Sequence, residues 1–147
     1  MAAGMDPGRR ASFLLPLSLV GCRKTASPTA AAEAFLDAYY VEHDHARALA
    51  VSADSAEARV RREQSLRAEA GGAYGVLPRV FYKFQRRREV EGVEELAYEV
   101  SIDSSGDRFK KTVVLRVKKY GEDWKVAAFA ERDEAAPQTT EGTEARP

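Results

Sequence analysis

The only cysteine of the chain, Cys22, directly follows a short apolar segment, and its thiol is the first group whose chemistry the sequence singles out. A pair of arginines precedes the segment, residues 11–20 are mostly apolar, and Gly21 is the small residue before the cysteine. A basic start, an apolar centre and a small final residue are the parts of a secretory signal peptide. The segment is too short to span a bilayer, which takes roughly 20 apolar residues. We therefore expect residues 1–21 to be a signal peptide that is cleaved after Gly21.

The four residues Leu19-Val20-Gly21-Cys22 resemble the lipobox of bacterial lipoproteins. The resemblance implies that Cys22 becomes the lipidated N-terminus of an exported protein, with about three acyl chains that each gain about 0.8 kcal/mol per buried CH₂. Such a protein is anchored to a membrane and faces the periplasm, and Arg23 in place of an aspartate favours the outer membrane. The alternative is a buried structural cysteine behind an ordinary leader. Lipidation is favoured because a lone cysteine in an exported chain has no partner for an internal disulfide.

The segment His43-Asp44-His45 holds both histidines of the chain and is the obvious candidate for a metal site. Two histidines two residues apart do not share a helical face, and a complete site would need distant carboxylates. The alternative is that Asp44 caps a helix and that solvated histidines flank it. We favour the cap and predict neither a metal nor a cofactor.

Cations gather in the second half of the sequence, at Arg86-Arg87-Arg88 and at two lysine pairs, Lys110-Lys111 and Lys118-Lys119. They are a candidate patch for anionic lipid headgroups or cell-wall polymers. The alternative, which we favour, is that they pair with glutamates across a solvated sheet face, where each ion pair contributes about 0 to 1 kcal/mol. The chain has 23 basic and 23 acidic residues, a balance that argues against nucleic acid as a partner.

The predicted organisation is a single small domain over residues 28–131. A tether, residues 22–27, joins it to Cys22, and residues 132–147 lack large apolar side chains and are expected to be a disordered tail. Ser27-Pro28 predicts the start of a long amphipathic helix with Phe35, Tyr39 and Tyr40 on its apolar stripe. Two shorter helices are predicted after it, capped by Asp44 and Ser55, and the last of them should be mostly exposed.

From Val80 onward the apolar residues repeat with a period of two, which predicts strands. Turn signals at residues 104–107 and 121–123 separate them into a four-stranded antiparallel meander. The expected inward faces are listed strand by strand: Val80, Tyr82, Phe84; Leu96, Tyr98, Val100, Ile102; Val113, Leu115, Val117; and Trp124, Val126, Ala128, Ala130. Because such a meander needs one face covered, the fold class is α+β, with the first helix packed on a curved sheet.

The order of helices and strands, with the segments AAEAFLDAYY, HDHARALA and GEDWKVAAF, resembles small lipoproteins of unknown function in the nuclear-transport-factor-2-like superfamily of cystatin-like cones. The resemblance implies a cone-shaped sheet around a long helix, with an apolar cleft at its mouth. The residues expected to line the cleft are Phe35, Tyr39, Tyr82, Tyr98 and Leu115.

Three functions follow from this resemblance. The first is a non-catalytic module that binds a small ligand or peptide in the cleft, and the second is an envelope scaffold that uses the outer face of the sheet. The third is an enzyme of the ketosteroid-isomerase-like type, for which Tyr39 or Tyr40 with Asp103 would be the acid–base groups. No catalytic motif carries these roles over, so we favour a binding protein without enzymatic activity. The ligand, the partner and the oligomeric state stay open.

Overall fold

A computed structural model of the chain describes residues 25–71 and 75–134. Residues 1–24, with the predicted signal peptide, Gly21 and Cys22, lie outside the described residues, as does most of the predicted tail. The helices are α1 (Pro28–Leu36), the π-helix η1 (Asp37–Val41), α2 (His45–Ala50) and α3 (Asp54–Glu69). The strands are β1 (Arg79–Val90), β2 (Val93–Ser104), β3 (Asp107–Tyr120) and β4 (Asp123–Asp133).

Two of the three predicted helix starts are confirmed. The Ser27 hydroxyl accepts the amide hydrogen of Ala30 at 3.1 Å, and the Asp44 carboxylate accepts that of Arg47 at 3.0 Å. Each cap satisfies an amide that has no partner inside its helix. The first helix passes into η1, where the Glu42 amide bonds the carbonyl of Asp37, five residues earlier. A π turn of this kind is rare and occurs often at functional sites.

The third helix differs from the prediction. Its N-cap residue is Ala53, and the Ser55 hydroxyl donates instead to the carbonyl of Ala127 on β4, at 3.1 Å. The predicted lengths, one long helix and two shorter ones, are wrong because α3 has 16 residues and is the longest single helix. Among its side chains only Ala56 and Val60 are buried, which agrees with the expected exposed face.

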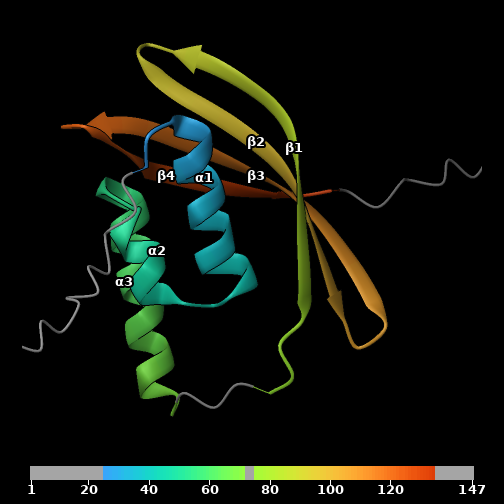
Figure 1. Cartoon of the computed structure of the whole chain (residues 1–147). Coiled ribbons are helices and arrows are strands. Elements are labelled where there is room, and N and C mark those ends of the chain that lie inside the picture. Colours follow the sequence, from blue (N-terminus) through green and yellow to red (C-terminus); the bar gives the residue numbers. More distant parts are fainter. Residues whose placement is uncertain (1–24, 72–74, 135–147) are drawn as a thin grey trace, which may run out of the picture.

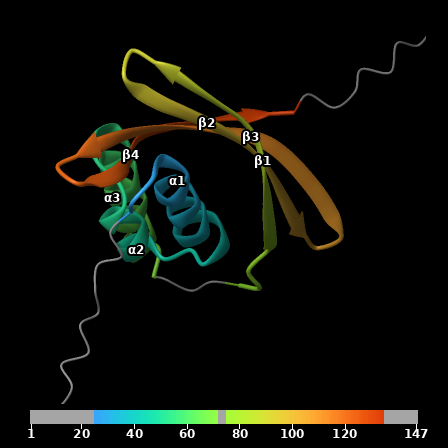
Figure 2. The same cartoon turned by 45° about the horizontal axis from the view of Figure 1, so that its top comes forward.

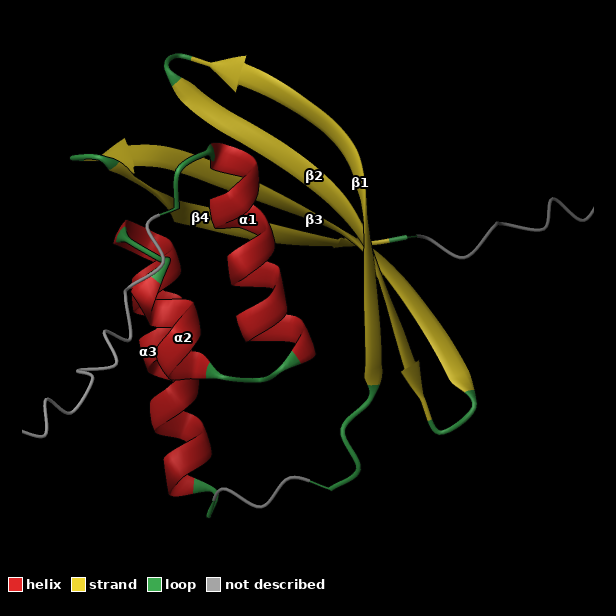
Figure 3. Cartoon of the chain, viewed as in Figure 1, coloured by secondary structure: helices red, strands yellow, loops and turns green. Residues whose placement is uncertain are grey.

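The four strands form one antiparallel sheet in the order β1-β2-β3-β4, which confirms the predicted meander. Tight hairpins join them, and Gly92 and Gly106 take positive φ angles of 77° and 90° in the first two turns, a region that glycine enters at no steric cost. All the helices lie on one face of the sheet (Figures 1 and 3). Figure 2, a turned view, shows α1 beneath the sheet, with α2 and α3 next to α1.

The core lies between this inner face and the helices. Its largest fully buried side chains are Tyr98, Phe35, Leu36, Leu96, Leu115, Val60, Val100, Val113, Val117 and Val126. The inner faces predicted for the second and third strands are confirmed by this set, apart from Ile102, which is partly buried against the core.

Two β-bulges change which residues face the core. In β1 the register shifts between Phe84 and Arg86, and in the β3–β4 pair it shifts between Arg116 and Val117. A bulge adds one residue to one strand, so every later side chain on that strand changes face. The predicted inward face of β4 is therefore wrong after Val126: Phe129 packs against the core, while Ala128 and Ala130 lie on the outer face.

The ends of the domain also differ from their predicted limits. β4 continues to Asp133, two residues beyond the expected end. At the start, Thr25 is buried, its carbonyl accepts the Trp124 amide at 3.1 Å, and its hydroxyl donates to the Trp124 carbonyl. The described part of the predicted tether is thus bonded along the edge of β4.

Candidate functional site

The five residues predicted to line a cleft lie in the core. Phe35, Tyr98 and Leu115 are fully buried, while Tyr39 and Tyr82 pack against the core and are partly buried. Phe35 stacks on Tyr39 with ring centroids 5.3 Å apart, and the Tyr82 ring meets that of Tyr98 edge-on at 5.8 Å. The structure therefore brings the predicted residues together, and they fill the space between the helices and the sheet with one another.

One polar atom in this core has no partner. The Tyr98 hydroxyl makes no hydrogen bond with any described residue, and burial, with the negative charge of Glu33, raises the pKa of Tyr98 to about 12. An unpaired buried hydroxyl costs about 1–3 kcal/mol. By contrast the Tyr82 hydroxyl donates to Asp37 at 2.7 Å, which ties β1 to the start of η1.

The histidine segment takes on a structural role. Asp44 is the predicted helix cap, but the prediction of solvated histidines is wrong for His45, which is 8% exposed. The His45 ring lies edge-on to Tyr39 at 6.1 Å, and burial lowers the pKa of His45 although Glu63 opposes the shift. The described residues contain no group of three His, Cys, Asp or Glu side chains arranged to hold a metal ion.

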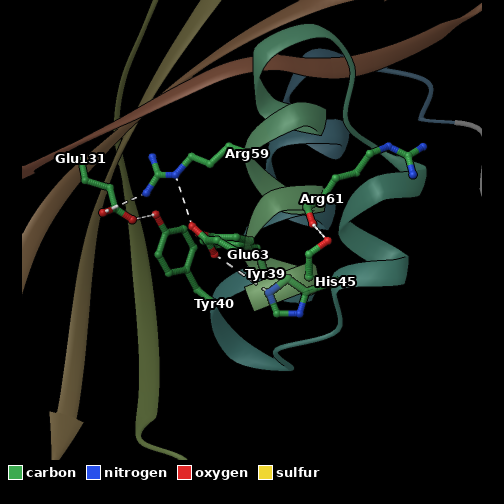
Figure 4. Close-up of polar contacts among 8 residues, drawn as sticks. Tyr39, Tyr40, His45, Arg59, Arg61, Glu63 and Glu131 are labelled. Carbon is green, nitrogen blue, oxygen red and sulfur yellow. Dashed lines mark hydrogen bonds and ion pairs between the residues drawn. The ribbon is translucent and has the colours of Figure 1, made fainter. Parts of the chain in front are cut away.

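Both tyrosines of η1 bond carboxylates (Figure 4). The Tyr39 hydroxyl lies 2.6 Å from both carboxylate oxygens of Glu63 on α3, and the Tyr40 hydroxyl donates to Glu131 on β4. Arg59 joins the two pairs, with its Nε 3.4 Å from Glu63 and its Nη2 3.5 Å from Glu131. We call these five residues the tyrosine–glutamate cluster. It connects η1, α3 and β4.

The predicted acid–base groups are therefore not assembled. Asp103 pairs with Arg108 at 2.7 Å in the β2–β3 hairpin, and both tyrosines bond glutamates that the sequence did not single out. Glu131 escaped notice because the period of two, continued past Val126, places residue 131 on the outer face. The bulge at Ala127 turns its side chain inward.

The electrostatics of the cluster hold its protons in place. Burial, and after it the hydrogen bonds to Glu63 and Glu131, raise the pKa values of Tyr39 and Tyr40 above the ordinary range of tyrosine. Burial alone would raise the pKa of Glu131, but the Tyr40 hydrogen bond and the charge of Lys111, 3.1 Å away, lower it below 4.5. Strongly held phenol protons and an ionised, ion-paired carboxylate are poorly matched to proton transfer near neutral pH. The cluster is suited to joining elements.

The outer face of the sheet carries a different kind of site. A hollow of about 470 Å³ opens there, lined by residues of all four strands. Four of its residues are Arg86, Arg88, Arg116 and Arg132, and its small residues are Val114, Ala128 and Ala130. Glu95 and Phe129 complete the lining. We call this hollow the arginine trough, because four guanidinium groups surround a small apolar floor.

Most of the charge in the trough is not neutralised by other described residues. Arg88 pairs with Glu95, the one acidic residue of the lining, at 2.7 Å. Arg86, Arg116 and Arg132 make no ion pair or hydrogen bond with another described side chain. Three guanidinium groups without an ion pair to any described residue line this one hollow, and arginine is suited to bind carboxylate and phosphate with two parallel hydrogen bonds.

The predicted pairing of cations with glutamates is thus confirmed only in part. Lys110 pairs with Glu99 at 3.3 Å on the outer face, as expected, and Arg87 pairs with Glu94 at 2.9 Å on the inner face. Arg86, Arg116 and Arg132 of the trough form no such pair with a described residue. The sequence did not indicate Arg116 and Arg132, because the pairing of all four strands is what places them in the same hollow as Arg86.

Comparisons of the chain with protein-family models, with curated proteins and with solved structures found no match. Within the described residues, no helix is both long and apolar enough to cross a bilayer. The class of the protein thus rests on its fold and surface: a small α+β domain with an open antiparallel sheet, a filled core and an arginine-lined outer face.

Proposed function

We propose that this domain binds an anionic ligand in the arginine trough, with no catalytic step. The observation that carries the proposal is a hollow with a floor of small apolar side chains, lined by three guanidinium groups that form no ion pair with a described residue. Cations that line the same hollow repel one another, and a bound anion reduces that repulsion. The ligand class is a molecule with several phosphate or carboxylate groups on a compact frame, because the hollow offers separated cations and about 470 Å³.

The proposal includes a location. We infer from the lipobox resemblance that the domain is exported, is anchored to a bacterial membrane through lipid on Cys22, and faces the periplasm, with the outer membrane preferred. Anionic polymers and headgroups are abundant in a bacterial envelope, which fits a cationic trough. The order of helices before a meander, with all helices on one face, supports a cone of the nuclear-transport-factor-2-like type. Among the functions considered from the sequence, a filled core favours use of the outer face.

Removing two trough arginines should abolish most of the binding. We expect the R86Q/R132Q variant to bind tripolyphosphate at least about tenfold more weakly than the unchanged protein, since one charged hydrogen bond contributes about 1.5–3 kcal/mol. Calorimetric titration measures the affinity. Both arginines are exposed and form no ion pair with a described residue, so the melting temperature should not fall.

The matched control removes two exposed cations elsewhere, in the R62Q/K119Q variant, and should change the affinity less than about twofold. Equal losses in both variants would contradict a defined site, because net charge alone would then explain binding. A parallel titration with phosphatidylglycerol vesicles separates a headgroup from a free phosphate as the source of the anion. Binding of neither probe would refute the proposal.

The lipid anchor has its own test. Mass spectrometry of the protein purified from bacterial membranes should find an N-terminus at Cys22 that carries a diacylglyceryl group and an acyl chain. The C22S variant should lose both the lipid and the membrane fraction, whereas S18A, a change inside the leader, should keep them. An intact leader with a free thiol on Cys22 would contradict this part of the proposal.

A further inference from the structure

The two edges of the sheet differ in whether other described residues cover them. The edge of β4 is covered by its own chain: the Val126 amide donates to Val51 at 2.9 Å, and the Ala53 amide donates to the Val126 carbonyl at the same distance. The free edge of β1 has no such cover, because β1 pairs only with β2 and no backbone hydrogen bond from the other described residues reaches it. Figure 3 shows β1 as an outer strand of the sheet.

An open edge of this length is unusual in a stable protein. β1 has 12 residues, each with an amide and a carbonyl, and an edge strand exposes part of these groups as a template for another strand. Proteins blunt such edges with charge, with proline or with a covering segment. β1 contains no proline, and all but one of its charged residues are cations.

Positive charge runs along the whole of β1. Arg79, Lys83 and Arg86 form no ion pair with a described residue, and Glu89 is the only acidic residue of the strand. If two copies of β1 paired edge to edge, cations of one copy would face cations of the other. Like charges that face each other across strands are destabilising. The charge therefore opposes self-association and favours an acidic strand.

Apolar side chains flank the same edge. Phe81 is 58% exposed and lies on the outer face, opposite Ser101 in the register. Phe84 is 47% exposed on the inner face, where its ring meets that of Tyr98 at 5.5 Å. A strand added beside β1 would cover one aromatic ring on each of its faces, in addition to the backbone hydrogen bonds that the edge offers.

We propose that the free edge of β1 binds an extended, acidic segment of a partner protein, which adds a fifth strand to the sheet. Main-chain hydrogen bonds supply affinity in this mode, and alternate side chains supply specificity. Glutamates of the segment face Arg79, Lys83 and Arg86 on the outer face, and the apolar residues that alternate with them cover Phe84 on the inner face. This surface adjoins the arginine trough and shares only Arg86 with it.

The probe is a labelled synthetic peptide of about ten residues, a length that one strand can pair, with glutamate alternating with valine. We expect it to bind, by fluorescence anisotropy, and to slow amide hydrogen exchange in residues 79–90. A peptide with lysine for each glutamate, and one with proline at its centre, should not bind, since the first reverses the charge and the second interrupts the hydrogen bonds.

Charge reversal in the R79E/K83E variant should weaken binding of the acidic peptide about tenfold, because both cations lie on the edge and outside the trough. The matched reversal R62E/K119E, on α3 and at the far end of β3, should change it less than about twofold. These four residues are exposed, so each variant is expected to fold.

Three results would overturn the inference. In the first, the proline peptide binds as well as the regular one, and R116Q/R132Q rather than R79E/K83E loses binding. This result would place the peptide in the trough through charge alone. Sedimentation could show a dimer that K83E disrupts, which would make a second copy the occupant of the edge. Absence of peptide binding by a protein that still binds tripolyphosphate would refute the edge site and leave the proposed function standing.

Discussion

Replacing Phe35 by alanine should lower the free energy of unfolding by about 3–5 kcal/mol. The ring is fully buried, stacks on Tyr39 and meets the Phe129 ring at 4.9 Å, so its removal leaves a cavity that three elements border. Urea unfolding followed by circular dichroism measures the loss. The effect is expected to be the largest of any single substitution considered for this chain.

The control is Phe109→Ala, which removes the same ring from a side chain that is 59% exposed. It should cost less than about 1 kcal/mol, because most of that ring already contacts solvent. The comparison also decides between a filled core and the cleft expected from the sequence. Equal, small losses in the two variants would show that Phe35 borders an open cleft.

The second large effect is expected from Glu131→Gln, which should lower the free energy of unfolding by about 2 kcal/mol at neutral pH. The carboxylate holds Tyr40, Lys111 and Arg59, and its side chain is only 27% exposed. The amide keeps the shape and one acceptor but loses the charge. Arg59 retains Glu63, so the main loss falls on Lys111 and Tyr40.

The stability difference between the unchanged protein and E131Q should depend on pH. The pKa of Glu131 is lowered below its ordinary value of 4.5 in the folded protein, so the ionised carboxylate stabilises the fold above pH 4.5. That contribution is lost as the pH falls through the folded pKa. The gap between the unchanged protein and E131Q should therefore be full at neutral pH and should shrink below pH 4.5.

Glu99→Gln is the matched control for the charge. Glu99 pairs with Lys110 at 3.3 Å on the outer face, where the lysine side chain is 45% exposed. A surface pair of this kind contributes about 0–1 kcal/mol, so E99Q should have a small effect. If E131Q cost no more than E99Q, or if its cost did not change with pH, the cluster would not join η1 to β4 as described.

Much of the fold could be predicted because its signals are local. Ser27 and Asp44 cap their helices by reaching an amide three residues away, and the turn at residues 104–107 ends one strand and begins the next within four residues. The Ser55 cap failed for the opposite reason, since its hydroxyl found an acceptor 72 residues away, on β4. A rule that considers only neighbours in the sequence does not include this distant acceptor.

The sequence by itself determined most of the helix and strand positions, the antiparallel meander and most of the core, because periods of two and 3.6 follow from backbone geometry within each element. Only the tertiary structure decided which side chains share a face beyond Gln85 and Ala127. A bulge depends on the pairing of two strands, and one extra residue turns every later side chain over. That is why Glu131 reaches the tyrosine–glutamate cluster and why Arg86, Ala128 and Arg132 line one hollow on the outer face.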